Sequence, residues 1–172
     1  VDFRLSDWDK AIEDLRAGRI DLLSGMYYSS KRDLLFEFTH PHQTNRYVAV
    51  VRADEGSAPE SREALRGKRL VVERADIAHD WLLREGLDAG LESGLGLVAN
   101  QEKALRQVLD GKRDVAVVSR ISAMHQIEKN GWTGLRVGDR ALFSAEYCIA
   151  FPHGKQALLA HLDRGLRRLH EK

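Results

Sequence analysis

Residues that mark amphipathic helices recur at helical spacing in five stretches of the chain, which predicts five helices. Ser6 or Asp7 is suited to cap the first helix, and Gly18 is placed to end it as a left-handed residue. The last predicted helix starts near Lys155. The marking positions are Trp8, Ala11, Ile12 and Leu15; Ile77, Ala78, Trp81 and Leu82; Ala104, Leu105, Val108 and Leu109; Ile121, Met124 and His125; and Leu158, Leu159, Leu162, Leu166 and Leu169.

Short apolar runs between these helices predict strands. Residues 53–61 (ADEGSAPES) are rich in small and turn-forming residues, which predicts a linker. Beyond it, strands alternate with helices of ordinary length, and this rhythm favours an α/β fold with a mostly parallel sheet. The predicted strands are residues 20–24, 47–52, 70–72, 95–98, 115–118, 135–137 and 147–151.

One motif occurs twice, once on each side of the predicted linker. Residues 18–21 (GRID) and 111–114 (GKRD) both follow an amphipathic stretch and precede an apolar run that ends in serine. The repeat favours two lobes built on one plan, and clefts between lobes are common ligand sites. The alternative is an ordinary helix-to-strand turn that the chain uses twice, and the motif alone leaves both open.

Composition and charge narrow the class of protein. The chain has 172 residues, of which 43% are hydrophobic and 31% charged, as in globular proteins. Its 27 basic and 26 acidic residues give a net charge of +1, so a nucleic-acid partner is not expected. Cys148 is the single cysteine and sits in an apolar run, which favours a buried residue over a reactive thiol. We find no signal peptide and no run of about 20 apolar residues, and we expect the chain to be a piece of a larger protein.

Five motifs in a fixed order carry a resemblance to a known family. They are the aromatic Trp8, then residues 18–21 (GRID), 29–32 (SSKR), 38–42 (FTHPH) and 64–68 (ALRGK). In this order and spacing they resemble the type II periplasmic solute-binding fold, in the amino-acid-binding branch of bacterial extracellular solute-binding family 3. The resemblance covers nearly the whole chain. Residues 76–82 (DIAHDWL) are most similar to the sensor domains of membrane histidine kinases, with Ala75 where that motif has glycine.

The resemblance implies a two-lobe (Venus-flytrap) α/β architecture. Residues 1–50 and 144–172 would form lobe 1, and residues 51–143 would form lobe 2. Lobe 1 is expected to lack its N-terminal strand–helix–strand in this chain. Strands near residues 47–52 and 145–151 would act as the hinge.

The resemblance also implies a set of ligand contacts in lobe 1. Arg32 stands where the family has an arginine that binds the ligand carboxylate through paired hydrogen bonds. A guanidinium suits this role because its N–H donors are paired and planar. Trp8 stands where the family places an aromatic wall, although Trp8 could equally be a core residue. The backbone from Tyr27 to Ser29 is expected to offer N–H groups to an anion. So is the N-terminus of the helix that opens at Asp76 or Ile77.

Two positions in lobe 2 depart from the amino-acid-binding pattern. Asp76 is suited to cap its own helix, where it would compete with a ligand carboxylate for the same N–H groups. Ser119 stands where amino-acid binders carry an aspartate that pairs with the ligand ammonium. An unpaired buried ammonium is costly, so a carboxylate ligand without an α-amino group fits better. Another pose, or no ligand at all, stays open. Asn100 is either a helix cap or, with Gln101, a polar contact.

These observations favour a solute-sensing domain outside the cytoplasm, which binds a small anionic or amino-acid-like solute between its lobes and signals by closure. The parent would be an inner-membrane receptor, tethered through flanking segments, with a histidine kinase as its expected output and a homodimer as one arrangement open to it. A free-standing transport binding protein is the first alternative.

An enzyme on the same fold, similar to a periplasmic dehydratase, is the second alternative. The acid–base candidates for it are Glu37, Glu73 and His79, and no motif surrounds any of them. We therefore expect a domain that is not an enzyme. We also expect no cofactor and no metal, although His40 and His42 are two residues apart.

Overall fold

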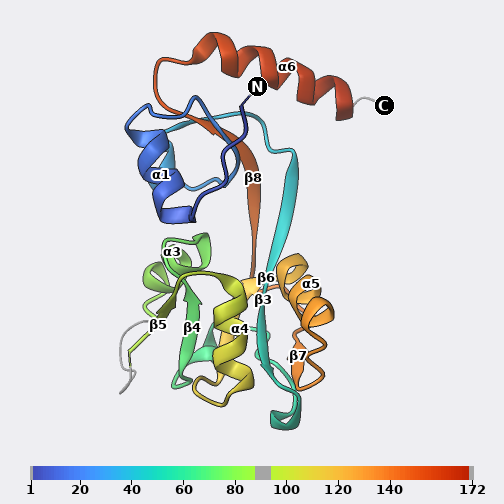
Figure 1. Cartoon of the computed structure of the whole chain (residues 1–172). Coiled ribbons are helices and arrows are strands. Elements are labelled where there is room, and N and C mark those ends of the chain that lie inside the picture. Colours follow the sequence, from blue (N-terminus) through green and yellow to red (C-terminus); the bar gives the residue numbers. More distant parts are fainter. Residues whose placement is uncertain (1, 88–93, 171–172) are drawn as a thin grey trace. The chain divides into compact units, whose positions relative to one another are not determined.

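The computed structural model describes residues 2–87 and 94–170, and in it the chain divides into two compact units (Figure 1). Unit 1 comprises Val1–Thr44 and Ala145–Lys172, and unit 2 comprises Asn45–Ser144. The chain passes from one unit to the other inside β3 (Gln43–Arg52) and again inside β8 (Phe143–Phe151). The segment at residues 53–61, expected as a linker, lies within unit 2, where Ala53–Glu55 form the short helix η1.

Unit 1 is built on strand β8. Strands β1 (Leu23–Tyr27) and β2 (Glu37–Phe38) both pair with β8 in antiparallel orientation. The helices of this unit are α1 (Trp8–Arg16), the short α2 (Ser30–Asp33) and the C-terminal α6 (Gln156–His170). Its core is formed by Leu15, Met26, Phe36 and Ala150, with Trp8, Ile12, Ile20, Leu23 and Phe38 packed around them.

Unit 2 contains the parallel sheet that the sequence predicts, extended by antiparallel strands. Its elements are η2 (Glu63–Leu65), β4 (Leu70–Glu73), α3 (Ile77–Arg84), β5 (Gly96–Val98), α4 (Gln101–Leu109), β6 (Val115–Ser119), α5 (Arg120–Asn130) and β7 (Leu135–Val137). Strands β4, β5 and β6 are parallel, with β4 in the middle, and β3 pairs antiparallel with β6 and with β7. Helix α4 packs on β4 and β6, while α5 packs on β6 and β7 (Figure 1).

Four elements differ from their predicted form. Strands β3 and β8 each begin four residues earlier than the predicted strands at residues 47–52 and 147–151. The strand expected at residues 20–24 begins later, as β1, because Ile20 packs on the core of unit 1 from the loop before the strand. Helix α5 forms where expected, but Ile121 and Met124 are 58% and 51% exposed. Its buried position is Ala123, so the face turned to the core differs from the predicted one.

The repeated Gly–basic–x–Asp motif performs the same backbone task in each unit. Gly18 and Gly111 directly follow the C-caps of α1 and α4, with φ angles of +68° and +71° that favour glycine. In unit 2, Asp114 accepts hydrogen bonds from the backbone N–H of Arg69 at 2.7 Å and from its guanidinium at 2.6 and 2.9 Å. This contact joins the starts of β4 and β6, so the motif is structural in that unit.

Candidate functional site

Arg32 is a buried cation held in a defined orientation within unit 1. Its side chain is on α2 and only 6% of the residue is exposed. Nη1 donates a hydrogen bond to the backbone carbonyl of Tyr27 at 2.8 Å, and the guanidinium carbon lies 5.8 Å from the centre of the Trp8 ring. Ser29 caps α2, because its Oγ accepts the Arg32 backbone N–H at 3.2 Å. The structure thus brings together the four lobe 1 residues singled out by sequence.

Of the two roles that the sequence left open for Trp8, the structure shows the core role. Trp8 opens α1 and packs on the core of unit 1, and its ring also lies against the Arg32 guanidinium. A cation close to an aromatic ring gains electrostatic stabilisation from the ring's electrons. Trp8 therefore helps to fix Arg32, whether or not it also contacts a ligand.

One of the backbone donors expected near residues 27–29 is already engaged. The N–H of Tyr28 donates to the carbonyl of Glu146 at 2.9 Å, as part of the pairing between β1 and β8. Strand pairing, which the sequence did not place at this residue, removes Tyr28 from the set of anion-binding donors.

In unit 2, Asp76 is the centre of a buried hydrogen-bond network. It caps α3 by accepting the N–H of Ala78 at 2.8 Å, as predicted. Its second oxygen accepts the hydroxyl of Tyr47 at 3.0 Å and the amide of Gln101 at 3.4 Å. Gln101 in turn accepts the backbone N–H of Ser119 at 3.1 Å. The network joins Tyr47 of β3, the N-terminus of α3 and the last residue of β6 to the first residue of α4.

The site residues of unit 2 include some whose role the sequence predicts and one whose role it does not. Asn100 caps α4 by accepting the N–H of Lys103 at 2.9 Å, as predicted. Ile77 and Ser119 are both buried, at 7% and 5% exposed. The sequence predicts only that Tyr47 lies in a strand, and nothing in its neighbouring residues indicates the bond to Asp76, which lies 29 positions further on.

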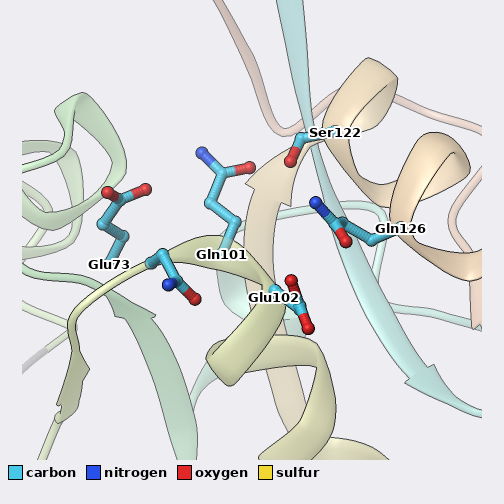
Figure 2. A pocket seen from close by; sticks show the side chains of 6 residues that line it. Glu73, Gln101, Glu102, Ser122 and Gln126 are labelled. Carbon is cyan, nitrogen blue, oxygen red and sulfur yellow. The ribbon is translucent and has the colours of Figure 1, made fainter. Parts of the chain in front are cut away.

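A polar pocket of about 290 Å³ opens beside this network, wholly within unit 2 (Figure 2). Gln101 stands between Glu73 on one side and the α5 side chains of Ser122 and Gln126 on the other. All six lining residues carry polar side chains, and none is Lys, Arg or His; they are Glu73, Asn100, Gln101, Glu102, Ser122 and Gln126. The pocket is therefore rich in hydrogen-bond acceptors and carries negative charge.

The remaining chemical candidates are divided between the two units. Glu37 lies in unit 1, where it bonds Gln156 at 3.0 Å, while Glu73 and His79 lie in unit 2. Nδ1 of His79 accepts the backbone N–H of Ala75 at 3.3 Å. Within residues 2–87 and 94–170, no group of three or more His, Cys, Asp or Glu side chains could hold a metal ion.

His40 and Cys148, two further candidates from the sequence, are held within the fold. Nδ1 of His40 contacts the carboxylate of Asp163 at 2.9 Å, and Asp163 also pairs with Arg167 at 3.1 Å. Cys148 is buried, as predicted, and burial raises the pKa of its thiol to about 11.

In the part of the chain that the structure describes, we find no helix with both the length and the apolar character that a membrane crossing requires.

Comparisons with known proteins place this geometry in a family. A histidine kinase sensor domain with similarity to periplasmic binding proteins is 32% identical, with a TM-score of 0.91; the match covers 99% of this chain and 73% of that one. Holo ArgBP from T. maritima is 24% identical, with a TM-score of 0.85, and the match covers 98% of this chain and 72% of ArgBP.

A third solved structure, the arginine-, lysine-, histidine-binding protein ArtJ from Geobacillus stearothermophilus, is 22% identical, with a TM-score of 0.82; the match covers 99% of this chain and 74% of ArtJ. No curated protein matches the sequence. The fold is that of type II periplasmic binding proteins, as predicted. The sequence pattern of the family matches residues 1–172, and the chain belongs to the bacterial extracellular solute-binding proteins, family 3.

Proposed function

We propose that this chain is the extracytoplasmic solute-sensing domain of a bacterial membrane receptor, with a histidine kinase as output. The observation that carries the proposal is the 32% identity to a histidine kinase sensor domain over 99% of the chain. The stretch at residues 76–82, similar to such sensors, also supports it. The domain acts in the periplasm, and flanking segments of the parent protein tether it to the inner membrane.

Arg32 is the proposed carboxylate-binding residue. A guanidinium presents paired donors in the geometry of a carboxylate, and burial strengthens such a bond because water competes less for it. The Tyr27 carbonyl and the Trp8 ring fix the side chain before any ligand arrives. A group that is already ordered loses less entropy on binding, which favours affinity.

The proposed signal is closure of two lobes around the solute. Only a difference in affinity between the closed and open states can shift that equilibrium, and a shift from 1:99 to 99:1 requires about 10⁴-fold. Strands β3 and β8 carry the chain between the units, so they are the proposed hinge.

The preferred solute is proposed to be a small carboxylate without an α-amino group. The α-ammonium of an amino acid requires a nearby anion in a dry site, and Ser119 supplies a neutral hydroxyl. Asp76 is committed to the N–H of Ala78 and the hydroxyl of Tyr47, so it is poorly placed to substitute. The common α-amino acids should therefore bind weakly.

A titration tests this proposal. The domain, expressed from its parent gene with natural flanking sequence, is screened by thermal shift against small carboxylates and common amino acids, and hits are measured by calorimetry. Arg32→Ala should abolish binding of every carboxylate, and Arg16→Ala, at an exposed arginine of α1, should not. Equal binding by the Arg32→Ala variant would remove Arg32 from the site. Micromolar binding of an ordinary amino acid would refute the argument from Ser119.

A free-standing binding protein of a transporter remains the competing function. The fold similarity to ArgBP and ArtJ favours it, since their names describe binding proteins. The parent gene separates the two functions: a membrane-spanning segment followed by a kinase domain supports the sensor, and their absence from the gene supports the transporter component.

A further inference from the structure

We infer that the polar pocket of unit 2, lined by Glu73, Asn100, Gln101, Glu102, Ser122 and Gln126, receives a cationic group of the solute, an ammonium or a guanidinium. The inference rests on the proposed function and narrows it. The solute class becomes small carboxylates that carry a second, cationic end away from the α-position.

The place of the pocket in the sheet supports a ligand site. Strand β4 is central, β5 lies on one side of it and β6 on the other, so the chain order reverses at β4. In open α/β sheets, ligands bind beyond the carboxyl ends of the strands where the order reverses. Glu73 is the last residue of β4, Asn100 comes two residues after β5, and Ser122 follows β6.

The lining determines which charge the pocket accepts. Glu73 and Glu102 contribute carboxylates, and none of the six lining residues is a cation. An anionic group would meet two like charges there, whereas an ammonium or guanidinium would gain two opposite ones. The pocket volume, about 290 Å³, is at the lower end of the volumes of ligand pockets and fits one end of a small solute.

Gln101, in the middle of the pocket, is held in place by hydrogen bonds to residues next to the pocket. Gln101 accepts the N–H of Ser119 and donates to Asp76, so its amide cannot rotate without breaking both bonds. Asn100 is likewise held by its cap bond to the N–H of Lys103. Fixed polar groups favour one ligand orientation, because little side-chain freedom is lost when the ligand binds.

The pocket adds a condition to the argument from Ser119. An α-ammonium lacks its family partner at Ser119. The carboxylates of Glu73 and Glu102 line the unit 2 pocket and favour a cationic group there over an anionic one. If the proposed function holds, ω-amino and ω-guanidino carboxylates meet both conditions.

Three probes that share a carboxylate and differ in the tail test the inference: 4-guanidinobutanoate, pentanoate and glutarate. Calorimetry on the domain with its natural flanking sequence should rank the cationic tail above the neutral tail and the neutral tail above the anionic one. Glu73→Gln and Glu102→Gln should each weaken 4-guanidinobutanoate by about tenfold, the worth of one charged hydrogen bond, and leave pentanoate unchanged. Glu128→Gln, at an exposed α5 residue outside the pocket, is the matched control and should have no effect.

The outcomes separate this inference from the proposed function. Equal affinities for the three tails, with Arg32→Ala still abolishing all binding, would overturn the pocket assignment alone. If no carboxylate binds, the proposed function fails, and methylguanidinium, which has no carboxylate, then tests the pocket by itself. Shifts of the NMR amide signals of residues 100–102 by methylguanidinium, absent in Glu102→Gln, would support the pocket, and their absence in the unaltered domain would overturn it.

Discussion

Replacing Asp76 by alanine should destabilise unit 2 more than the loss of an ordinary helix cap. Asp76 is 8% exposed and accepts three hydrogen bonds, from the Ala78 N–H, the Tyr47 hydroxyl and the Gln101 amide. Loss of a cap costs about 1 kcal/mol of unfolding free energy. A buried donor left without its partner costs about 1–3 kcal/mol more. The structure therefore predicts a loss of about 2–4 kcal/mol for Asp76→Ala.

Asn100→Ala is the matched control, because Asn100 caps α4 of the same unit with one bond, to the N–H of Lys103. We expect about 1 kcal/mol for it. Urea denaturation of both variants measures the two free energies. A loss for Asp76→Ala no larger than that for Asn100→Ala would refute the reasoning, because it would mean that the bonds to Tyr47 and Gln101 contribute nothing.

A double-mutant cycle with Tyr47→Phe isolates one of these bonds. Phenylalanine retains the ring, which stacks on Phe143 at 4.8 Å, and removes only the hydroxyl. In the Tyr47→Phe background, Asp76→Ala should cost at least about 0.5 kcal/mol less than alone, since residues in one hydrogen-bond network do not behave additively. Additive losses would show that the two groups are not coupled.

Three further changes have effects that follow from single features. Ala75→Gly should raise the unfolding free energy by about 0.5–1 kcal/mol in urea denaturation, because Ala75 has a left-handed φ of 60°. Gly25→Ala should lower the melting temperature, since an added Cβ would collide with the Tyr147 ring, which packs against the Tyr27 ring and would have to move. Hydrogen bonds from the Arg69 side chain hold the pKa of Asp114 below its usual range. Its stabilising effect is therefore present above the unfolded pKa and lost as pH falls through the folded one, so the cost of Asp114→Asn in urea denaturation should be about 1 kcal/mol at pH 7 and should shrink as the pH falls below the unfolded pKa.

The elements that the sequence predicted well are those with strong local signals. Helix α4 has a cap, a periodic apolar face and a terminal glycine, and its bounds follow from Asn100 and Gly111. The start of β1 was wrong, because an apolar residue such as Ile20 can serve the core from a loop as well as from a strand. Periodicity alone also chose the wrong core face for α5, where Ala123 rather than Met124 is buried.

Some features of the candidate site also follow from local sequence signals, and others do not. The cap roles of Asp76 and Asn100 follow from local rules, as does the link between Ser29 and Arg32 three residues later. The pocket does not, because its side chains come from the ends of separate strands and helices. Only the order of strands in the sheet brings Glu73 and Ser122 to the same pocket, and no motif in either segment encodes that order.

Closure around a bound solute is the central claim, and a distance measurement tests it most directly. Spin labels at Arg16→Cys in unit 1 and Lys112→Cys in unit 2 report the separation of the units. The native Cys148 is buried, and its thiol pKa is raised to about 11 by burial, so it should stay unlabelled. Pulsed dipolar spectroscopy should show a shifted and narrower distance distribution when a binding carboxylate is added, and no shift with Arg32→Ala. An unchanged distribution at saturating solute would contradict the account.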